Sequence, residues 1–244
     1  MRMLSALEWL NVWEHGQAQS LPARALAILA AACPDTPPET LARLNIGQRD
    51  ACLLTLREWT FGPQLAGLAM CPSCGERLEL TCNVADIQAP SPDASESTLS
   101  LHMVGYEVCF RLPNSLDLMA VAASTDEALP HQQLLERCLL AVRYQGIEQA
   151  IDQLPTDVEQ AVGARMAQAD PQADVQLALS CPGCRHHWQA PFDIVSFFWN
   201  ELNAWACRIL RDVHTLASAY GWREADILAM SSWRRQVYLE MVNG

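Results

Sequence analysis

The sequence contains no segment suited to export or to insertion into a membrane. Its longest apolar run, residues 25–33, is far shorter than the roughly 20 residues that span a bilayer. Glu8, Asn11 and Glu14 interrupt the apolar character of the N-terminal segment, and no small-residue cleavage site follows it. We therefore expect a cytoplasmic protein that carries no signal peptide and makes no contact with a membrane.

Positive charge is also scarce. The 244 residues include 16 Lys and Arg against 28 Asp and Glu, which gives a formal net charge of −12. A negative field of this size repels anionic lipid surfaces and the phosphate backbone of nucleic acids. We therefore do not expect nucleic acid among the partners, since a general nucleic-acid binder is usually basic.

Catalytic motifs are missing as well. The sequence has no glycine-rich phosphate loop, no nucleophile elbow and no paired-carboxylate signature, and it lacks both HExxH and the deaminase pattern of HxE with PCxxC. Hydrophobic residues make up 50% of the chain, which is enough to fill the core of one large domain or two modest ones. The sequence predicts a folded protein that is not an enzyme.

Cysteine, by contrast, is abundant. Of the ten cysteines, Cys71 with Cys74 and Cys181 with Cys184 form two CPxC motifs. A structural zinc ion takes four such ligands in a tetrahedron, and two residues between cysteines let one turn present both sulfur atoms. Because disulfides are rare in the cytosol, we expect these four cysteines to bind one structural Zn²⁺ ion. The other six are expected to be small buried core residues.

The two CPxC turns, here called knuckles, are separated by residues 75–180, whereas a compact zinc ribbon has about 15–20 residues between them. Loop-closure entropy grows only logarithmically with length, so an inserted subdomain can bring the knuckles together. Three alternatives stay open: a redox dithiol, a catalytic zinc ion, and buried cysteines without metal. His186 and His187 follow Cys184 directly. Three roles stay open for these histidines: replacement of a cysteine as a zinc ligand, support of the site, or a position at the surface.

The apolar pattern predicts an α+β fold that is mainly α. We expect a small zinc ribbon with a long inserted α/β segment, flanked by N- and C-terminal helical regions. The expected parts are an N-terminal helical region (1–67), a split zinc ribbon (68–87 and 175–191), an insert with strands and helices (88–174) and a C-terminal helical region (192–244).

Periodicity places the individual elements. Helices are expected at residues 3–15, 20–33, from 36 onward, 48–59, from 116 onward, 132–144, 156–169, 192–220, 222–230 and 232–242, with strands at 76–87, 99–112 and 175–179 and an exposed loop at 88–98. Ser20 is expected to cap its helix. Thr36 with Glu39 and Thr156 with Glu159 are expected to form capping boxes, in which a hydroxyl and a carboxylate satisfy each other's exposed amides.

Aromatic and arginine side chains gather near the C-terminus. Trp222, Trp233, Arg234, Arg235 and Tyr238 form the densest cluster outside the knuckles. Protein interfaces favour these residue types, so the five are candidate partner-binding residues. Packing between helix ends is one alternative, and stacking of nucleic-acid bases on the rings is another.

Several segments together resemble a known family. They are LPARALAILAAACPDTPPETLARLNIGQRDACLLTLREWTFGP, the two knuckles, DVQLALSCPGCRHHWQAPFDIVSFFWNEL and YGWREADILAMSSWRRQVYLEMV. These segments are similar to the zinc-ribbon proteins of contractile injection systems and phage tails that are known as T4-type phage baseplate proteins or baseplate hub assembly chaperones. The family usually has Trp-Glu-Arg-x-x-Tyr in the last segment, and Arg234 replaces the acidic residue here.

The resemblance implies a non-enzymatic role in the baseplate of a contractile tail. It implies partners among the other baseplate, hub, spike and tape-measure proteins. It also implies a cytoplasmic location during assembly, followed either by incorporation into the tail-like particle or by release as a chaperone. The alternative function is that of a zinc-ribbon protein that binds nucleic acid or acts in transcription.

Overall fold

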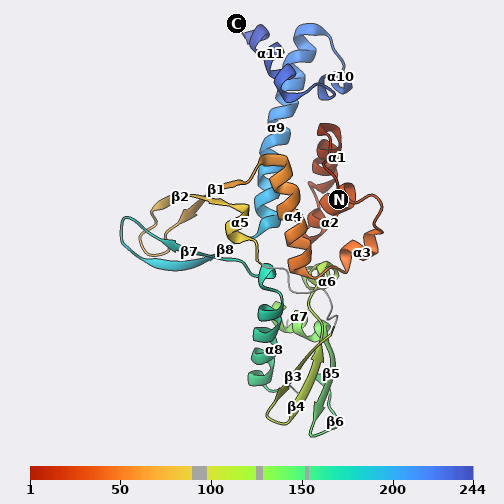
Figure 1. Cartoon of the computed structure of the whole chain (residues 1–244), viewed down its shortest axis with the longest axis vertical. Helices are drawn as coiled ribbons and strands as arrows, with labels where there is room; N and C mark the ends of the chain where they lie inside the picture. The colour runs from red at the N-terminus through yellow and green to blue at the C-terminus, as the bar shows by residue number, and fades with distance from the viewer. Residues whose placement is uncertain (90–97, 125–128, 152–153, 244) are drawn as a thin grey trace.

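The computed structural model describes residues 1–89, 98–124, 129–151 and 154–243. The fold is mixed α+β and mainly helical, as the sequence predicts. It is elongated along the helix α9 (Ile194–Tyr220), as Figure 1 shows. Helices of the N-terminal region pack around the first half of α9, and the last helices of the chain pack on its far end. Two long hairpins project to one side, and a sheet with its own helices occupies the end opposite the C-terminus.

The N-terminal helices form the main core with α9. They are α1 (Ala6–Gly16), α2 (Leu21–Ala32), α3 (Pro38–Ala42) and α4 (Ile46–Phe61). Ile28 and Leu53 are fully buried against Phe198 and Leu202 of α9. Apolar side chains on one face of each helix thus surround the first half of α9, which becomes the axis of the molecule.

Two of these helices begin at capping boxes. Ser5 and Glu8 form the box that begins α1, and Asn45 and Gln48 form the box that begins α4. In each, the side chain of the first residue accepts from an exposed amide of the first turn, and the side chain of the second accepts from the backbone of the capping residue. These boxes fix where both helices start, although the sequence analysis did not identify them.

A buried ion pair joins α4 to α9. The side chain of Arg57 is 2% exposed, and its Nε and Nη2 donate to the carboxylate of Glu201 at 2.8 and 2.6 Å. Its Nη1 donates to the carbonyl oxygen of Gly62 at 2.7 Å. One guanidinium therefore fixes the C-terminal end of α4, just before the first hairpin begins, against the long helix.

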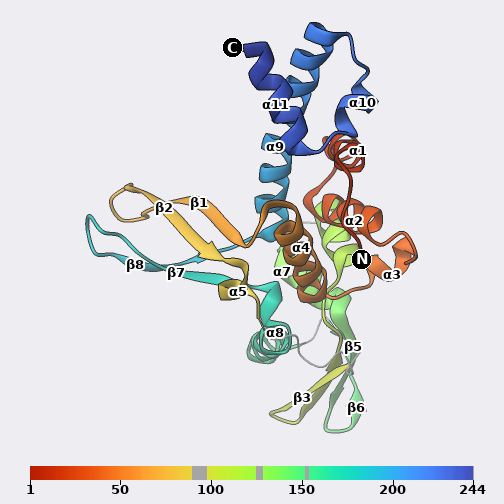
Figure 2. The same ribbon diagram turned by 45° about the horizontal axis from the view of Figure 1, so that its top comes forward.

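Each hairpin is a separate two-stranded antiparallel sheet. The first pairs β1 (Gln64–Met70) with β2 (Arg77–Asn83), and the second pairs β7 (Gln176–Ser180) with β8 (His187–Pro191). The two hairpins lie side by side in Figures 1 and 2. The N-terminal helical region was expected to extend to residue 67, with its last helix at 48–59. In the structure α4 ends at Phe61 and the strand β1 already begins at Gln64, after Pro63. Leu65 of this strand is buried in the main core.

The chain between the hairpins folds around a second core. Its elements are α5 (Val84–Ile87), β3 (Leu99–Met103), β4 (Tyr106–Phe110), α6 (Ser115–Ala123), α7 (Pro130–Cys138), β5 (Leu139–Tyr144), β6 (Ile147–Glu148), α8 (Thr156–Ala169) and a short 3₁₀ turn, η2 (Pro171–Ala173). The strands form one sheet in the order β3-β4-β5-β6. Val158 and Val162 of α8 pack against Val108, Phe110 and Val142 on one face of this sheet.

Three expectations for this region were wrong. The strand expected at residues 76–87 ends at Asn83, and residues 84–87 form the short helix α5. Residues 99–112 form a hairpin instead of one strand, because Val104 and Gly105 have positive φ (50° and 82°) and reverse the chain in two residues. Residues 132–144 are helical only in part, because residues 139–144 pair with β4 as the strand β5. The expected loop at 88–98 falls mostly on residues 90–97, which lie outside the described residues.

The predicted caps of three helices also differ from the structure. Pro37 and Pro155 take the N-cap positions of α3 and α8, so neither Thr36 nor Thr156 begins a capping box. Proline presets the backbone for a helix start, and each threonine lies one residue away from the capping position. Ser20 does occupy the N-cap of α2, but its side chain makes no capping hydrogen bond.

The two ends of the inserted segment meet at one buried side chain. Gln172 is 5% exposed, and its Oε1 accepts a hydrogen bond of 2.7 Å from the amide of Ala89. Close by, the carboxylate of Asp170 accepts a hydrogen bond of 2.9 Å from the amide of Gly47, at the start of α4. Residues far apart in the sequence are therefore held at the base of the hairpins, which is what the loop-closure reasoning requires.

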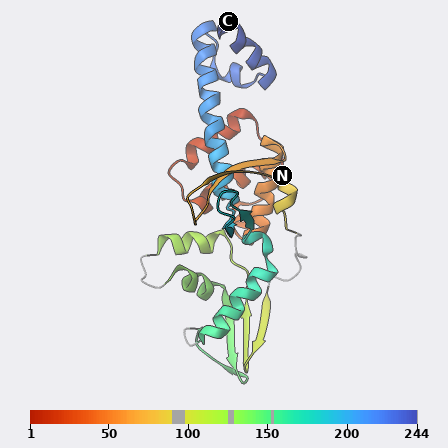
Figure 3. The same ribbon diagram turned by 90° about the vertical axis from the view of Figure 1, so that its left-hand side faces the viewer.

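The C-terminal region is helical, as predicted. Helix α9 ends at Gly221, whose left-handed φ of 66° suits glycine, and α10 (Glu224–Leu228) and α11 (Ser232–Asn243) fold back on it (Figure 3). Ile227 is fully buried among the side chains of α9. Within the described part of the chain, none of the helices has both the length and the apolar character needed to cross a membrane.

Candidate metal centre

A knuckle lies at the tip of each hairpin, away from the helical body (Figure 1). Residues 71–76 connect β1 to β2, and residues 181–186 connect β7 to β8. The strand registers run without a break up to both turns, as far as Met70 opposite Arg77 and Ser180 opposite His187. The paired strands therefore continue up to both CPxC motifs.

The two turns share one backbone pattern. In the first, the amide of Cys71 donates to the carbonyl oxygen of Glu76 at 2.8 Å, and the amide of Gly75 donates to the carbonyl oxygen of Cys71 at 2.9 Å. The corresponding amides of Cys181 and Arg185 make the same bonds in the second turn, both at 2.9 Å. The knuckles are therefore equivalent structures as well as similar sequences.

The equivalence extends to a backbone conformation that favours glycine. Gly75 has a φ of 75°, and Arg185 has a φ of 60° at the matching position. A left-handed conformation costs an ordinary L-residue about 1–2 kcal/mol. The second knuckle thus keeps the geometry of the first despite a residue that disfavours it.

All four sulfur atoms of the knuckles lie within 4.8 Å of one another. The Sγ atoms of Cys71 and Cys184 are 3.6 Å apart, and so are those of Cys74 and Cys181. A tetrahedral zinc site with Zn–S bonds of about 2.3 Å has sulfur–sulfur separations of about 3.8 Å. The four cysteines could therefore hold a metal ion of this kind. Among the described residues they are also the one group of cysteine, histidine or carboxylate side chains so arranged.

The surroundings of the four cysteines are built from both hairpins. Cys71 and Cys181, the first cysteine of each knuckle, are buried beside Leu78, while Cys74 and Cys184 are exposed. Trp188 packs on this small core from β8. The site therefore has one covered side and one side open to solvent.

The histidines after Cys184 do not join the sulfur cluster. His186 and His187 are both exposed, and the ring of His186 stacks on Trp188 at 6.0 Å.

Gly183 lies close to the other knuckle, since a Cβ on it would be 3.0 Å from Oε2 of Glu76. The close approach of the two knuckles accounts for a residue without a side chain at this position.

The thiols of the first knuckle have shifted pKa values. Burial raises the pKa of Cys71, but backbone amides of Cys74 and Ser73 donate to its sulfur and lower the pKa to about 7. An amide donor from Glu76 lowers the pKa of Cys74, but the neighbouring thiols and burial raise it to about 12. Thiolates at this spacing repel one another, and a divalent cation is what allows all four to ionise together.

The remaining cysteines do not form a second cluster. All ten cysteines of the chain are free thiols. Cys138 is buried, as expected, and burial raises its pKa to about 11. Burial also raises the pKa values of Cys52 and Cys82. Cys207 is exposed, so the expectation that every one of these six is buried was wrong.

The structure brings part of the predicted partner cluster together. The ring of Trp222 stacks on Tyr220 at 4.4 Å and meets the edge of Tyr238 at 4.8 Å. The guanidinium of Arg234 lies 5.8 Å from the centre of the Tyr238 ring. Trp222 and Tyr238 are half-buried, so they mainly pack α11 against the end of α9.

The other two members of the cluster, Trp233 and Arg235, differ in exposure to solvent. Arg235 is 8% exposed, and its Nε is 3.5 Å from Oδ2 of Asp212 on α9, so it stabilises the fold. Trp233 is 76% exposed on the outer side of α11. Met241 is two turns further along this helix and is 66% exposed. Trp233 and Arg234 are therefore the predicted partner residues that remain available at the surface.

The family described as T4 bacteriophage base plate protein matches residues 10–199. The chain belongs to this family. The match includes both knuckles, the inserted segment and the start of α9, and it ends before the C-terminal segment that contributed to the resemblance seen in the sequence. Searches of curated proteins and of solved structures found no match.

Membership of the base plate family confirms the resemblance and identifies the protein as a phage baseplate component. The family is a structural one, in agreement with the absence of catalytic motifs in the sequence. Membership of this family implies that the protein acts together with other phage baseplate proteins. The match gives no support to the alternative of a nucleic-acid-binding or transcription-related protein.

Sequence reasoning found the four cysteines but missed much of what positions them. It did not identify the strand β1, the packing of half-buried Trp188 beside the site or the closure of the insert by Gln172. The alternation of apolar residues in 64–70 is blurred by Gly67 and by exposed Leu68. The repeated hairpin around each CPxC motif was the available signal, since a knuckle needs a strand on both sides.

Proposed function

We propose that Cys71, Cys74, Cys181 and Cys184 bind one structural zinc ion and that the two hairpins form a split zinc ribbon. The observation that carries this proposal is the pair of 3.6 Å sulfur–sulfur distances between knuckles of identical backbone pattern. Four sulfur donors and no histidine or carboxylate are typical of a closed structural site. A redox dithiol or a catalytic metal does not require such an arrangement.

The ion would supply four bonds where the protein has few contacts of its own. The two hairpins belong to different sheets, and a small core around Leu78 and Trp188 joins their tips. Metal binding of this kind contributes directly to the free energy of folding. The bound ion would therefore turn two separate hairpins into one rigid arm.

The protein would serve the baseplate as a scaffold without catalytic activity. The zinc-ribbon arm, made of residues 64–83 and 176–191, projects from the helices of residues 6–61. The inserted segment and the C-terminal helices extend to opposite ends of the molecule. Separate parts that point in different directions suit a protein that holds several neighbours in place. We propose hub, spike and tape-measure proteins as these neighbours. Exposed Trp233 and Arg234 are part of the contact surface.

The experiment is metal analysis combined with an assembly assay. We expect one zinc per chain in the purified wild-type protein and in the control Cys109→Ser, whose cysteine lies outside the cluster. We expect Cys74→Ser to lose the ion and much of its solubility. A Cys74→Ser protein with one zinc per chain and unchanged thermal unfolding would refute the zinc proposal.

The assembly assay uses cells that express the complete set of tail genes. Without this gene, we expect no complete contractile tails, and the wild-type gene supplied in trans should restore them. Normal tails in the absence of the gene would show that the scaffold function is wrong. Immunoblots of the purified tails then distinguish a resident subunit, which is retained, from an assembly chaperone, which is released.

A further inference from the structure

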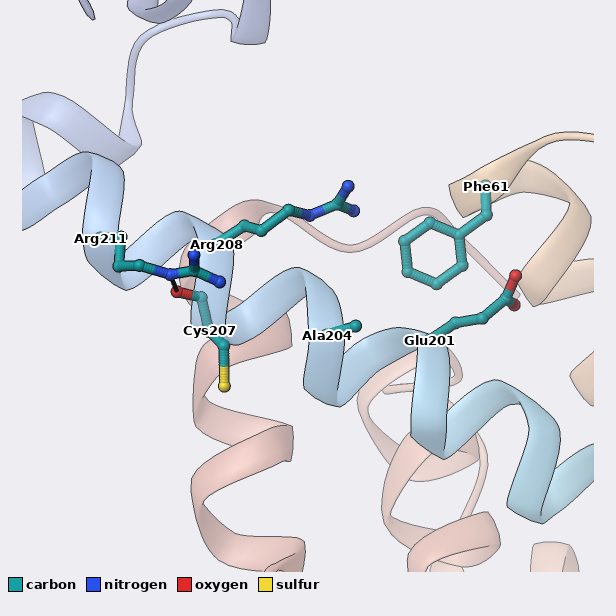
Figure 4. A pocket seen from close by; sticks show the side chains of 6 residues that line it. All are labelled: Phe61, Glu201, Ala204, Cys207, Arg208 and Arg211. Carbon is teal, nitrogen blue, oxygen red and sulfur yellow. Dashed lines mark hydrogen bonds between the residues drawn. The ribbon is translucent and has the colours of Figure 1, made fainter.

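A pocket beside α9 has features that the scaffold role does not by itself explain. It has a volume of about 490 Å³ and lies between the end of α4 and the middle of α9 (Figure 4). The residues that line it are Phe61, Glu201, Ala204, Cys207, Arg208 and Arg211. This volume is in the range of sites that bind small ligands or the side chains of a partner.

The pocket has an apolar part and a cationic part. Phe61 of α4 and Ala204 of α9 form the apolar part, and in Figure 4 the side chain of Arg208 extends along α9 toward Phe61. Arg211 lies one turn further along, where its Nε donates to the carbonyl oxygen of Cys207 at 3.0 Å. That bond uses one of the five N–H groups of its guanidinium.

Neither of the two cations has a carboxylate partner in the part of the chain that the structure describes. Arg57 and Arg235, which also contact α9, are each paired with a carboxylate. Within the described residues, neither Arg208 nor Arg211 lies within 4.0 Å of an acidic oxygen, although acidic residues greatly outnumber arginines in the chain. Like charges one turn apart on a helix repel each other, so the pair weakens α9 when no anion is bound.

The surface around the pocket also differs in charge from the protein as a whole. The exposed face of α9 between residues 200 and 218 carries Arg208 and Arg211 and no unpaired acidic side chain. The two acidic residues of the helix, Glu201 and Asp212, are held by Arg57 and Arg235. A positive strip with an apolar pocket therefore lies on a molecule of net charge −12.

We propose that this pocket binds an acidic segment of a partner protein, with a carboxylate against Arg208 and Arg211 and an adjacent apolar side chain against Phe61 and Ala204. Guanidinium groups bind carboxylates through paired hydrogen bonds, which gives both attraction and orientation. A free phosphate would leave the apolar part unfilled. Nucleic acid would bring a long anionic backbone against the rest of an acidic protein.

The proposal rests on the scaffold function only in naming the partner as a baseplate subunit. It extends that function by assigning one contact surface and the chemistry that the surface recognises. The pocket lies beside α4 and the middle of α9. The zinc-ribbon arm and the helix α11 lie in other parts of the molecule, so this contact surface is separate from both.

A binding titration with the purified full-length protein tests the pocket. The probes are a fluorescein-labelled 12-residue peptide of alternating glutamate and leucine, its glutamine–leucine counterpart and a single-stranded DNA of 12 nucleotides. We expect the acidic peptide to bind and the other two probes to bind at least about tenfold more weakly. Equal binding of the neutral peptide, tighter binding of DNA or no binding of the acidic peptide would overturn the proposal.

Matched variants locate the binding site. Arg208→Glu/Arg211→Glu should weaken binding of the acidic peptide by at least about tenfold, because it reverses both cations. Arg43→Glu/Arg165→Glu makes the same change in net charge at two exposed arginines elsewhere and should leave binding within about twofold of wild type, because distant exposed charges are screened. Equal losses in the two double variants would show a general effect of charge and overturn the proposal.

A variant of the apolar part separates shape from charge. Ala204→Trp should fill the space beside Phe61 and weaken peptide binding without changing the charge. Circular dichroism and zinc content of each variant should match those of wild type, so that weaker binding reflects the pocket. Peptide binding that survives in folded Ala204→Trp at full strength would count against insertion of a side chain here.

Co-purification from cells that express the tail genes then links the pocket to assembly. We expect tagged wild-type protein to retain a baseplate subunit that Arg208→Glu/Arg211→Glu loses and the control double variant keeps. If both double variants retain the same subunits, the pocket has no role in assembly, and the scaffold function still stands. If wild type retains no baseplate subunit, the scaffold function fails, and the titration alone decides what the pocket binds.

Discussion

The buried pair of Arg57 and Glu201 gives a quantitative prediction for the stability of the core. Arg57→Met keeps most of the buried aliphatic length but removes three hydrogen bonds, two to Glu201 and one to the carbonyl oxygen of Gly62. Removing one partner of a buried ion pair costs about 3–5 kcal/mol, mainly because the other charge loses its partner. The side chain of Glu201 is 27% exposed and can turn partly toward water, so we expect the lower end, about 3 kcal/mol.

Urea unfolding of the zinc-loaded protein, followed by tryptophan fluorescence, measures this loss. For a chain of this size the same loss lowers the melting temperature by about 6–12 °C. The double variant Arg57→Met/Glu201→Leu should recover part of the loss, because no unpaired carboxylate remains. A loss below about 1 kcal/mol for Arg57→Met, or no recovery in the double variant, would refute the role assigned to this pair.

Three further variants test particular positions. Arg185→Gly should raise the free energy of unfolding by about 0.5–1 kcal/mol, measured by urea unfolding, because glycine relieves the positive φ but adds entropy to the unfolded chain. Burial raises the pKa of Asp50 to about 6, although Arg49 beside it acts in the opposite direction. Between pH 4 and 6 the folded state therefore binds more protons than the unfolded state, and the free energy of unfolding falls as pH rises through this window. Asp50→Asn should remove that loss, and its stability relative to wild type should be higher at pH 6.5 than at pH 4.5. Gly47→Ala would place a Cβ 1.7 Å from Oδ1 of Asp170 and should increase hydrogen exchange at the start of α4.

Local signals in the sequence predict much of the fold. Helical periodicity predicted the long helix at residues 192–220, and the structure confirms it as α9, Ile194–Tyr220. The approach of the four knuckle cysteines follows from ligand chemistry, because a CPxC turn presents two sulfur atoms and one ion needs two turns. The long segment between Cys74 and Cys181, residues 75–180, did not prevent the prediction, since the entropy cost of loop closure grows only slowly with loop length.

Tertiary contacts explain the elements that were mispredicted. Residues 139–144 have helical spacing, but their backbone completes the sheet beside β4, and pairing with a neighbouring strand outweighs a weak helical preference. The turn at Val104 could not be expected from residue type, because a β-branched side chain rarely adopts positive φ. Glycine at position 105 was the remaining signal of a hairpin.

The candidate sites show the same division between local and tertiary information. The knuckles could be read from four residues and their spacing. The pocket beside α9 could not, because Phe61 and Arg208 come from different helices and meet only after α4 packs on α9. The roles of Arg234 and Arg235 were also indistinguishable in the sequence, although the structure buries Arg235 against Asp212 and leaves Arg234 exposed.

X-ray absorption spectroscopy at the zinc edge on the purified full-length protein tests the central claim most directly. The account predicts one zinc per chain with four sulfur ligands at about 2.3 Å and no nitrogen ligand. A first shell that contains nitrogen from His186 or His187, or a protein that folds to the same stability with no bound metal, would contradict it.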